Sequence, residues 1–352
     1  MSIYKAPAVS VITPIYNGEE LLADSIRSIQ RQTLQDFEII AVDDGSDDRT
    51  AALVAEFQRA DARIRLVRHT SNAGYPHACN TGFAHARGNY MVMMDHDDIA
   101  LPDRLEQSVG FLDAHPEIDG CSGVHAIFSP MPWVRAWRTG AALRGARYLE
   151  PETVGAYTLF GGVFYNPTAC FRRELLHRVA VWHDPSLKTG SDDDFFERLI
   201  AGGARFAVLP RVAILYRRRR NSNSRRYAGL SARIRTGIAR RAVGRLVPEA
   251  TREELALHDR LVLRDALPGE EDEAAVRAWF GKLLRYGTPR WGEGVKQVLG
   301  LNWQRYCAVR AGEDFFAALR AVRDFPELAG YTGSLGVFLY QAQKRMVRNL
   351  FT

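Results

Sequence analysis

Three aspartates stand close together after an apolar run, and their chemistry is the first feature of the sequence that suggests a function. Asp95, Asp97 and Asp98 follow the apolar residues 90–94. Like charges this close in a partly desolvated crevice repel one another unless a cation is present. Mg²⁺ or Mn²⁺ fits best, because both prefer oxygen ligands and leave coordination positions for substrate phosphates. A solvated acidic turn is the alternative interpretation, and it would be favoured for an isolated cluster of this kind.

Side chains suited to a nucleotide follow two earlier apolar segments. Tyr16 comes after residues 9–12, and Asp43 and Asp44 come after residues 37–42. A tyrosine ring can lie against a base, and a carboxylate can accept hydrogen bonds from base or ribose donors. Tyr16 alone would be more typical of a packed turn residue, but Asp44 at the end of the next strand favours a base slot. Neither a G-x-G-x-x-G motif after a strand nor a phosphate-loop motif occurs, so a nucleotide must be held differently.

The elements that position these residues follow from the hydrophobic pattern. Residues 9–12, 37–42, 64–67 and 90–94 are short apolar runs rich in branched and aromatic side chains, as expected of strands buried on both faces. Helical spacing recurs between them, for example at Leu22, Ile26 and Ile29. Alternating strands and helices predict an α/β fold with a mostly parallel sheet, in which ligands bind beyond the carboxyl ends of the strands.

Composition and charge limit the classes of protein that the chain could be. Its 352 residues, 46% of them apolar, suffice for one large domain and a smaller one. The net charge is +6, and residues 211–245 contain twelve arginines and no acid, so the remainder is acidic. Four widely spaced cysteines fit neither a disulfide framework nor a zinc site, and we expect a reducing cytoplasm. Neither a signal peptide nor a membrane span is expected.

The first hundred residues resemble a known family. The stretch VSVITPIYNGEELLADSIRSIQRQTLQDFEIIAVDDGSDDRT, followed by NAGYPHACNTGFAHARGNYMVMMDHDD, is similar to the family 2 glycosyltransferases, inverting enzymes of the GT-A fold that use nucleotide-sugar donors. The resemblance implies nucleotide-binding and metal-binding roles for six residues. Pro14 and Tyr16 would line the base pocket, Asp44 would bind the base edge, Asn72 matches the donor-site pattern, Asp97 would face the ribose and the metal, and Asp98 would be the direct metal ligand.

The resemblance continues more loosely through the acceptor half. The segments NPTACFRREL and TGSDDDFFERLIAGG resemble the family's acceptor region and place Asp192 at the general base, with Ser191 where a Glu is usual. Alternatively, Ser191 and Asp192 cap a helix. In YRRRRNSNSRRY, Arg217 and Arg219 would belong to a loop that closes over the diphosphate. Trp182 is a candidate platform for the acceptor sugar, although a single Trp is nearly as typical of a core.

The resemblance implies a GT-A domain over residues 1–228, with a nucleotide-binding half over about 1–100 and an acceptor half over about 101–228. Residues 229–352 are expected to form a mainly helical C-terminal region. The basic amphipathic segment after Gly333 is expected to pack as a helix, and a membrane-surface anchor is the alternative. The processive-synthase motif Q-x-x-R-W is absent, which argues against a chain-extruding polymerase.

The expected function is that of a metal-dependent inverting glycosyltransferase. Mn²⁺ or Mg²⁺ is the expected cofactor, a UDP-sugar the first choice of donor, and a glycan or lipid-linked hydroxyl the acceptor in surface polysaccharide synthesis. A cytoplasmic location is expected, with peripheral contact to the inner face of the membrane. One rival hypothesis is an Arg-rich nucleic-acid-binding protein, although no nucleic-acid partner is expected because stacking aromatics are not interleaved with the Arg run. A degenerate sugar-nucleotide-binding module is a further alternative.

Overall fold

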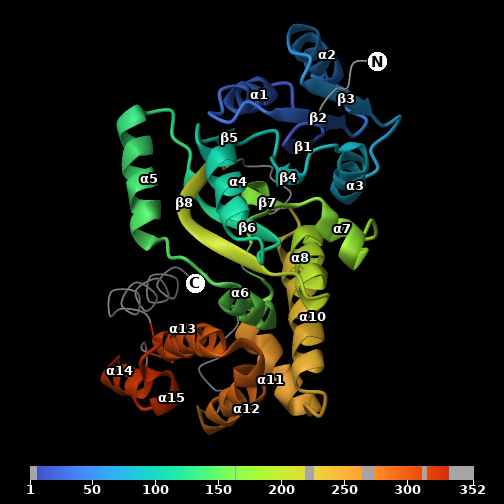
Figure 1. The fold of residues 1–352 in the computed structure, drawn as a ribbon. Coiled ribbons are helices and arrows are strands. Elements are labelled where there is room, and N and C mark those ends of the chain that lie inside the picture. Colours follow the sequence, from blue (N-terminus) through green and yellow to red (C-terminus); the bar gives the residue numbers. More distant parts are fainter. Residues whose placement is uncertain (1–5, 163, 219–225, 264–272, 311–314, 333–352) are drawn as a thin grey trace. The chain divides into compact units, whose positions relative to one another are not determined.

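A computed structural model describes residues 6–162, 164–218, 226–263, 273–310 and 315–332 of the chain. It divides into two compact units, each described here by itself (Figure 1). The first comprises Met1–Leu149 and Phe164–Ser231, and the second comprises Glu150–Val163 and Ala232–Thr352. Residues 150–163 therefore belong with the C-terminal helices. The expected boundary at residue 228 places them instead in the first domain.

The first unit is built on one eight-stranded sheet with the order β3-β2-β1-β4-β7-β6-β8-β5. Strands β1 to β4 are mutually parallel, whereas β7 runs antiparallel to both of its neighbours, β4 and β6. At the far edge, β8 is parallel to β6 and antiparallel to β5. The strands are β1 (Val9–Ile15), β2 (Phe37–Asp43), β3 (Ile64–Arg68), β4 (Tyr90–Met93), β5 (Ile99–Ala100), β6 (Gly120–Ile127), β7 (Ala169–Arg172) and β8 (Phe206–Tyr216).

The four strands expected from the apolar runs are confirmed. The burial of the strands explains why their residues are apolar. Every residue of β1, β2 and β4 is buried, because helices cover both faces of a parallel sheet. The connecting helices have the predicted periodicity, and Leu22, Ile26 and Ile29 form the buried face of the first. The helices of this unit are α1 (Leu22–Gln30), α2 (Thr50–Ala60), α3 (Tyr75–His85), α4 (Arg104–Ala114), α5 (Pro132–Gly145), α7 (Glu174–Val179) and α8 (Ser191–Ala201).

The second unit is helical and has its own hydrophobic core. Trp279, Phe280, Trp303 and Tyr306 are almost fully buried in it. Its helices are α6 (Pro151–Tyr157), the 3₁₀ helix Thr158–Phe160, α10 (Ala228–Leu246), α11 (Arg252–Val262), α12 (Glu273–Trp291), α13 (Glu293–Arg310), α14 (Phe315–Arg323) and α15 (Pro326–Ala329). The division between the units falls inside α10. Among the helices that the structure describes, none combines the length and apolar character that a bilayer crossing requires.

Candidate active site

The sheet order brings the predicted site residues to one edge. Strands β2, β1 and β4 are adjacent and parallel, so the residues that follow them lie at the same ends of neighbouring strands. Asp44 follows β2, Tyr16 follows β1, and the three aspartates follow β4. The crevice beyond the carboxyl ends of parallel strands is the usual ligand site of such sheets.

The three aspartates form a cluster that can hold a divalent cation. One carboxylate oxygen each from Asp95, Asp97 and Asp98 lies within 4.8 Å of the others. The turn that carries them is closed by the N–H of Asp98, which donates to the carbonyl oxygen of Asp95 over 3.3 Å. The hydroxyl of Ser25, on α1, donates to the same carbonyl over 3.1 Å. Oxygen donors on a fixed turn are the ligands that Mg²⁺ and Mn²⁺ prefer.

Asp98 is the most buried member of the cluster, and one of its carboxylate oxygens lacks a hydrogen-bond partner among the described residues. Its side chain is inaccessible to solvent, and Oδ1 accepts a hydrogen bond from the backbone N–H of Arg217 over 3.0 Å. Its other oxygen, Oδ2, has no hydrogen-bond partner among the residues that the structure describes. Burial, followed by the charges of Asp95 and Asp97, raises the pKa of Asp98 to about 8. The donor set and the unpartnered oxygen therefore fit a bound cation.

Asp95 is connected to the acceptor half through two residues that the sequence did not single out. The hydroxyl of Tyr75, at the start of α3, donates to Asp95 Oδ1 over 3.2 Å, and Asn166 Nδ2 donates to the Tyr75 oxygen. Burial, together with the negative charges of Asp95 and Asp192, raises the pKa of Tyr75. The negative charge of Asp192 thus contributes to the environment of the same hydroxyl. Nothing in the local spacing could have identified this link, because Tyr75 and Asn166 are far apart in the sequence.

Asp192 lies in the first turn of α8, the helix predicted to carry the general base. The N-cap residue is Gly190, with φ of +66°, so neither Ser191 nor Asp192 occupies the N-cap position that the alternative interpretation gave them. Asp194 is buried and pairs with Arg198, with 2.7 Å between Oδ2 and Nε. Asp192 is partly buried. The positive end of the helix dipole stabilises carboxylates in this turn.

Asp44 is buried at the end of β2 and orders the loop that contains Asn72. Its carboxylate accepts hydrogen bonds from the backbone N–H groups of Ala73 and Gly74 over 2.9 and 2.8 Å, and Oδ1 lies 2.7 Å from Nδ1 of His69. The loop packs so closely on Gly45, whose φ is +68°, that an added Cβ would lie 2.4 Å from a backbone atom of Ser71. The geometry thus gives Asp44 a structural role beside any contact with a base.

The other predicted nucleotide residues differ in exposure. Pro14 is buried within β1, whereas the side chain of Tyr16, immediately after the strand, is 43% exposed. Asn72 is exposed in the loop that Asp44 orders. An exposed aromatic ring after β1 and a buried carboxylate after the neighbouring strand β2 are compatible with a base slot.

Arg217 is held away from solvent by contacts at both of its ends. Its guanidinium donates to Asp24 Oδ2 on α1 over 2.6 Å and lies over the ring of Phe128, 4.7 Å from the ring centre. Its backbone N–H bonds Asp98, as described above. In this structure the side chain therefore pairs with Asp24, and its proposed role at a diphosphate stays a prediction. Arg219, the second predicted loop arginine, lies outside the described residues.

Trp182 lies in the segment before α8, which is anchored to α3. Its side chain is 39% exposed and lies beside Phe83, and its carbonyl accepts a hydrogen bond from Arg198 over 2.6 Å. Asn80 bonds both the N–H and the carbonyl of His183, the next residue. The exposed indole is thus presented by a fixed backbone, as a sugar platform requires.

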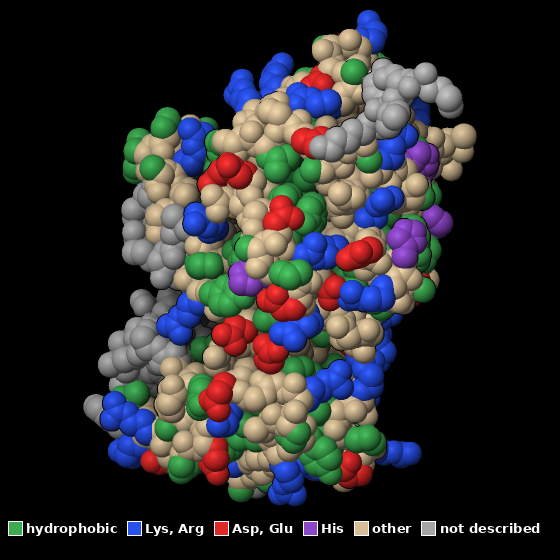
Figure 2. Space-filling model, in the orientation of Figure 1, with side chains coloured by type: hydrophobic (Ala, Val, Ile, Leu, Met, Phe, Trp, Pro, Cys, Tyr) green, Lys and Arg blue, Asp and Glu red, His purple; other side chains and the backbone are tan. Residues whose placement is uncertain are grey.

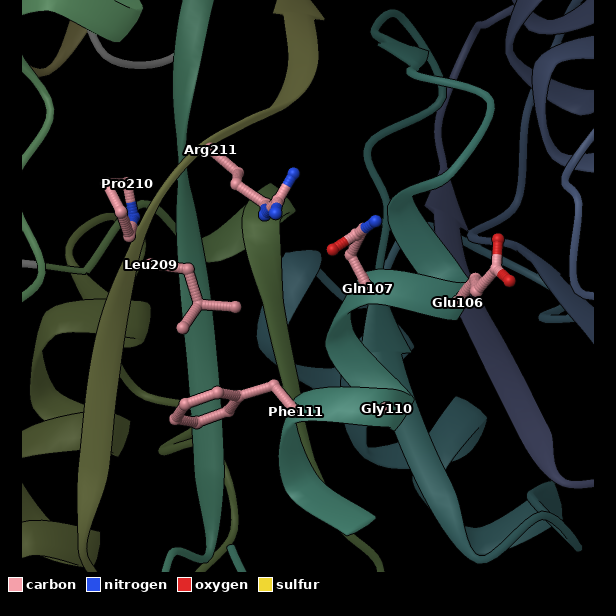
Figure 3. Close-up of a pocket in the computed structure, with 7 residues that line it drawn as sticks. All are labelled: Glu106, Gln107, Gly110, Phe111, Leu209, Pro210 and Arg211. Atoms are coloured by element: carbon pink, nitrogen blue, oxygen red, sulfur yellow. The ribbon is translucent and has the colours of Figure 1, made fainter. Parts of the chain in front are cut away.

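A separate pocket of about 410 Å³ lies between α4 and β8 (Figure 3). Phe111, Leu209 and Arg211 are among its lining residues. Its lining includes neither the carboxylate cluster nor Asp192, so the candidate active site is defined by the cluster and not by this pocket.

Comparisons with known proteins agree with the geometry. Residues 10–179 match the model of the family described as glycosyl transferase family 2. The chain is 31% identical over 222 residues to the uncharacterized glycosyltransferase EpsJ of Bacillus subtilis, an alignment that covers 61% of this chain and 62% of EpsJ. It is 29% identical over 226 residues to the succinoglycan biosynthesis protein ExoO of Rhizobium meliloti, with 64% of each chain covered. The chain thus spans less than two thirds of the length of either relative.

Two solved structures share the fold. One is S. aureus TarS 1-349 in complex with UDP-GlcNAc, with a TM-score of 0.55, 18% identity, and coverage of 92% of this chain and 91% of that one. The other is the mannosyltransferase PcManGT from Pyrobaculum calidifontis in complex with GDP-Man and Mn²⁺, with a TM-score of 0.54, 20% identity, and coverage of 97% and 88%. The fold is the GT-A fold, and residues 10–179 of the chain match glycosyl transferase family 2.

Proposed function

We propose that the protein is a metal-dependent inverting glycosyltransferase that moves a sugar from a nucleotide-sugar to a hydroxyl group of a glycan or lipid-linked acceptor. The observation that carries this proposal is the cluster of Asp95, Asp97 and Asp98, in which a buried carboxylate oxygen lacks a partner among the described residues. Asp98 and Asp97 would hold Mn²⁺ or Mg²⁺. When bound, the ion supplies charge neutralisation for the departing diphosphate.

The residues of the chain would then perform a single displacement. Asp192 takes the proton of the acceptor hydroxyl, whose oxygen attacks the anomeric carbon from the face opposite the diphosphate. The bond between that carbon and the diphosphate oxygen breaks, so the configuration is inverted. A protonated acid is not needed for the leaving group, in contrast to a glycosidase. The link from Asp95 through Tyr75 to Asn166 connects the carboxylate cluster to the segment that resembles the family's acceptor region.

The donor is proposed to be a UDP-sugar, and a GDP-sugar is the alternative. TarS was solved with UDP-GlcNAc and PcManGT with GDP-Man, so the fold accommodates both nucleotides. ExoO is a succinoglycan biosynthesis protein, which supports a role in surface polysaccharide synthesis. We propose a cytoplasmic enzyme with peripheral membrane contact. The basic segment after Gly333, one candidate for that contact, lies outside the described residues.

The rival nucleic-acid hypothesis loses support from the ion pairs of the Arg-rich segment. Arg217 pairs with Asp24, and Arg240 forms an ion pair with Asp259. Arginines that form ion pairs within the protein are less available to the phosphates of a nucleic acid. Ion pairs of this kind are expected on a protein surface that carries both charges.

A screen of UDP- and GDP-linked sugars tests the proposed function. In the presence of Mn²⁺, either UDP or GDP should raise the melting temperature. At a ligand concentration about a hundredfold above Kd, binding should add about 3 kcal/mol to the free energy of unfolding. EDTA should remove both this stabilisation and donor turnover. Stabilisation without turnover of any donor would instead support the degenerate binding module. Turnover that is unaffected by EDTA would contradict the role proposed for the cluster.

A further inference from the structure

The start of α5 exposes more apolar side-chain surface than is usual for a soluble helix. Trp133 is 72% exposed and Met131 is 54% exposed, the two highest values among the large hydrophobic side chains that the structure describes. Proline at positions 130 and 132 flanks Met131 and fixes the local backbone. A tryptophan left this far in water gains free energy from any apolar surface that covers it. This segment is therefore suited to contact with another molecule.

The charge around this segment identifies the kind of surface that would cover it. Residues 120–149 contain four arginines and no Asp, Glu or Lys. Arg147 is exposed and Arg135 is partly exposed, while Arg138 donates to the carbonyl of Phe128 over 2.9 Å. Figure 2 shows hydrophobic and basic side chains next to each other over the start of α5, at the upper left. Such a surface is complementary to one that is apolar and negatively charged.

We propose that Met131 and Trp133 insert into the interface of an anionic lipid bilayer, to which the excess positive charge of residues 120–149 is attracted. Tryptophan prefers the boundary between headgroups and acyl chains, and arginine is attracted to anionic lipid. Met131 has no ring to stack on a base, so the pair suits acyl chains better than nucleic acid.

Contacts within the first unit connect this surface to the carboxylate cluster. Arg138 of α5 bonds the carbonyl of Phe128, whose ring lies under the guanidinium of Arg217. The backbone of Arg217 in turn bonds Asp98. The proposed bilayer contact is therefore connected to the carboxylate cluster through Phe128 and Arg217. If the proposed function holds, this placement favours an acceptor anchored in lipid over a freely soluble glycan.

Vesicle co-sedimentation of the full chain tests the proposal without donor or acceptor. Wild-type protein should bind vesicles that contain phosphatidylcholine and phosphatidylglycerol, bind phosphatidylcholine alone weakly, and bind less as salt increases. Replacing both apolar side chains, Met131→Ser with Trp133→Ser, should weaken binding to the anionic vesicles at least about fivefold. The melting temperature should not change, because both side chains are exposed. Tyr286→Ser, at an exposed aromatic residue of the second unit, is the matched control and should bind like wild type.

Three results would overturn the proposal. The first is equal vesicle binding by the double variant and the wild type, which would assign any membrane contact to another segment. The second is a loss of binding in the Tyr286→Ser control as large as in the double variant. The third is tighter binding to a single-stranded oligonucleotide that the double variant abolishes. If the protein binds vesicles through Trp133 but transfers no sugar, the proposed function is refuted and the inferred membrane contact stands.

Discussion

Asp98 combines two properties at the scale of a single residue, full burial and repulsion by two neighbouring carboxylates. Without a cation, the raised pKa of Asp98 means that the folded chain takes up a proton there that the unfolded chain does not bind at neutral pH, which lowers the stability of the folded state. Asp98→Asn keeps Oδ1 as an acceptor for the N–H of Arg217 and removes the ionisable group. We therefore expect the metal-free variant to be more stable than wild type at neutral pH, by about 1 kcal/mol or more.

Mn²⁺ should reverse that order. The ion should stabilise the wild type against urea and leave the variant unchanged, because the variant lacks the buried ligand. Unfolding curves with and without Mn²⁺ measure both effects. A metal-free variant that is less stable than wild type, or that still gains stability from Mn²⁺, would show that Asp98 is not the principal ligand.

Asp24 is a second residue whose role follows from geometry alone. It holds the guanidinium of Arg217, whose backbone positions Asp98, although its own side chain is 55% exposed. An ion pair this exposed contributes little to stability, so an effect on activity would report positioning. We expect Asp24→Asn to raise the Mn²⁺ concentration needed for half-maximal activity by about threefold to tenfold, a loss of about 1 kcal/mol in binding. The rate at saturating Mn²⁺ should change little.

Asp36→Asn, at an exposed aspartate elsewhere in the first unit, provides the control for Asp24→Asn. It should have the wild-type Mn²⁺ requirement. If both variants show the wild-type requirement, the contact between Asp24 and Arg217 does not position Asp98.

The elements of the nucleotide half could be predicted from the sequence, whereas several of its contacts could not. Residues of β1, β2 and β4 alternate with amphipathic helices, so the local pattern determined both the strands and the edge at which Asp44 and Asp98 lie. Tyr75, Asn166 and Asp24 were missed because their partners come from distant parts of the chain. The assignment of residues 150–163 to the helical unit was missed for the same reason, since packing between distant segments leaves no local period.

The loop after β3 gives a prediction at the scale of an element. Two of its backbone N–H groups, those of Ala73 and Gly74, depend on the carboxylate of Asp44. Asp44→Ala should leave both groups without this acceptor and weaken UDP binding by about 1 to 3 kcal/mol, measured by calorimetry with Mn²⁺ present. An unchanged affinity would mean that neither Asp44 nor the loop it orders contacts the nucleotide.

The helical unit contains a buried histidine that should make its stability depend on pH. His258 Nε2 donates to the carbonyl of Leu159 over 2.6 Å, and Nδ1 accepts from Nε1 of Trp279 over 3.1 Å, so both nitrogens are satisfied in the neutral ring. Burial lowers the pKa of His258 to about 4 from its usual 6.5. Between these values the unfolded chain binds the proton and the folded chain does not, so stability falls as pH decreases.

His258→Gln separates this contribution from the titration of other groups. The amide can accept from Trp279 and donate to Leu159 but cannot take up a proton. Urea unfolding at a series of pH values should show the wild type losing up to about 3 kcal/mol relative to the variant between pH 6.5 and 4. A constant difference between the two proteins across that range would contradict the assignment of a neutral buried ring.

At the scale of the whole molecule, donor binding and sugar transfer should depend on different residues. The carboxylate cluster and Asp44 would bind the donor, and Asp192 would act only on the acceptor proton. The sequence resemblance implies this division, and the negative charges of Asp95 and Asp192 both raise the pKa of Tyr75. A change at Asp192 should therefore affect the rate of transfer and not the affinity for the donor.

The most direct test is the rate of sugar transfer by Asp192→Asn at saturating donor and Mn²⁺, with Asp193→Asn as the matched control in the same helical turn. The rate of transfer by Asp192→Asn should fall at least about a hundredfold, since general base catalysis commonly contributes a factor of 10² to 10⁴ to the rate. Its affinity for UDP and Mn²⁺ should stay near that of wild type, and Asp193→Asn should keep most of its activity. Full transfer by Asp192→Asn, or loss of transfer in Asp193→Asn alone, would contradict the assignment of the general base.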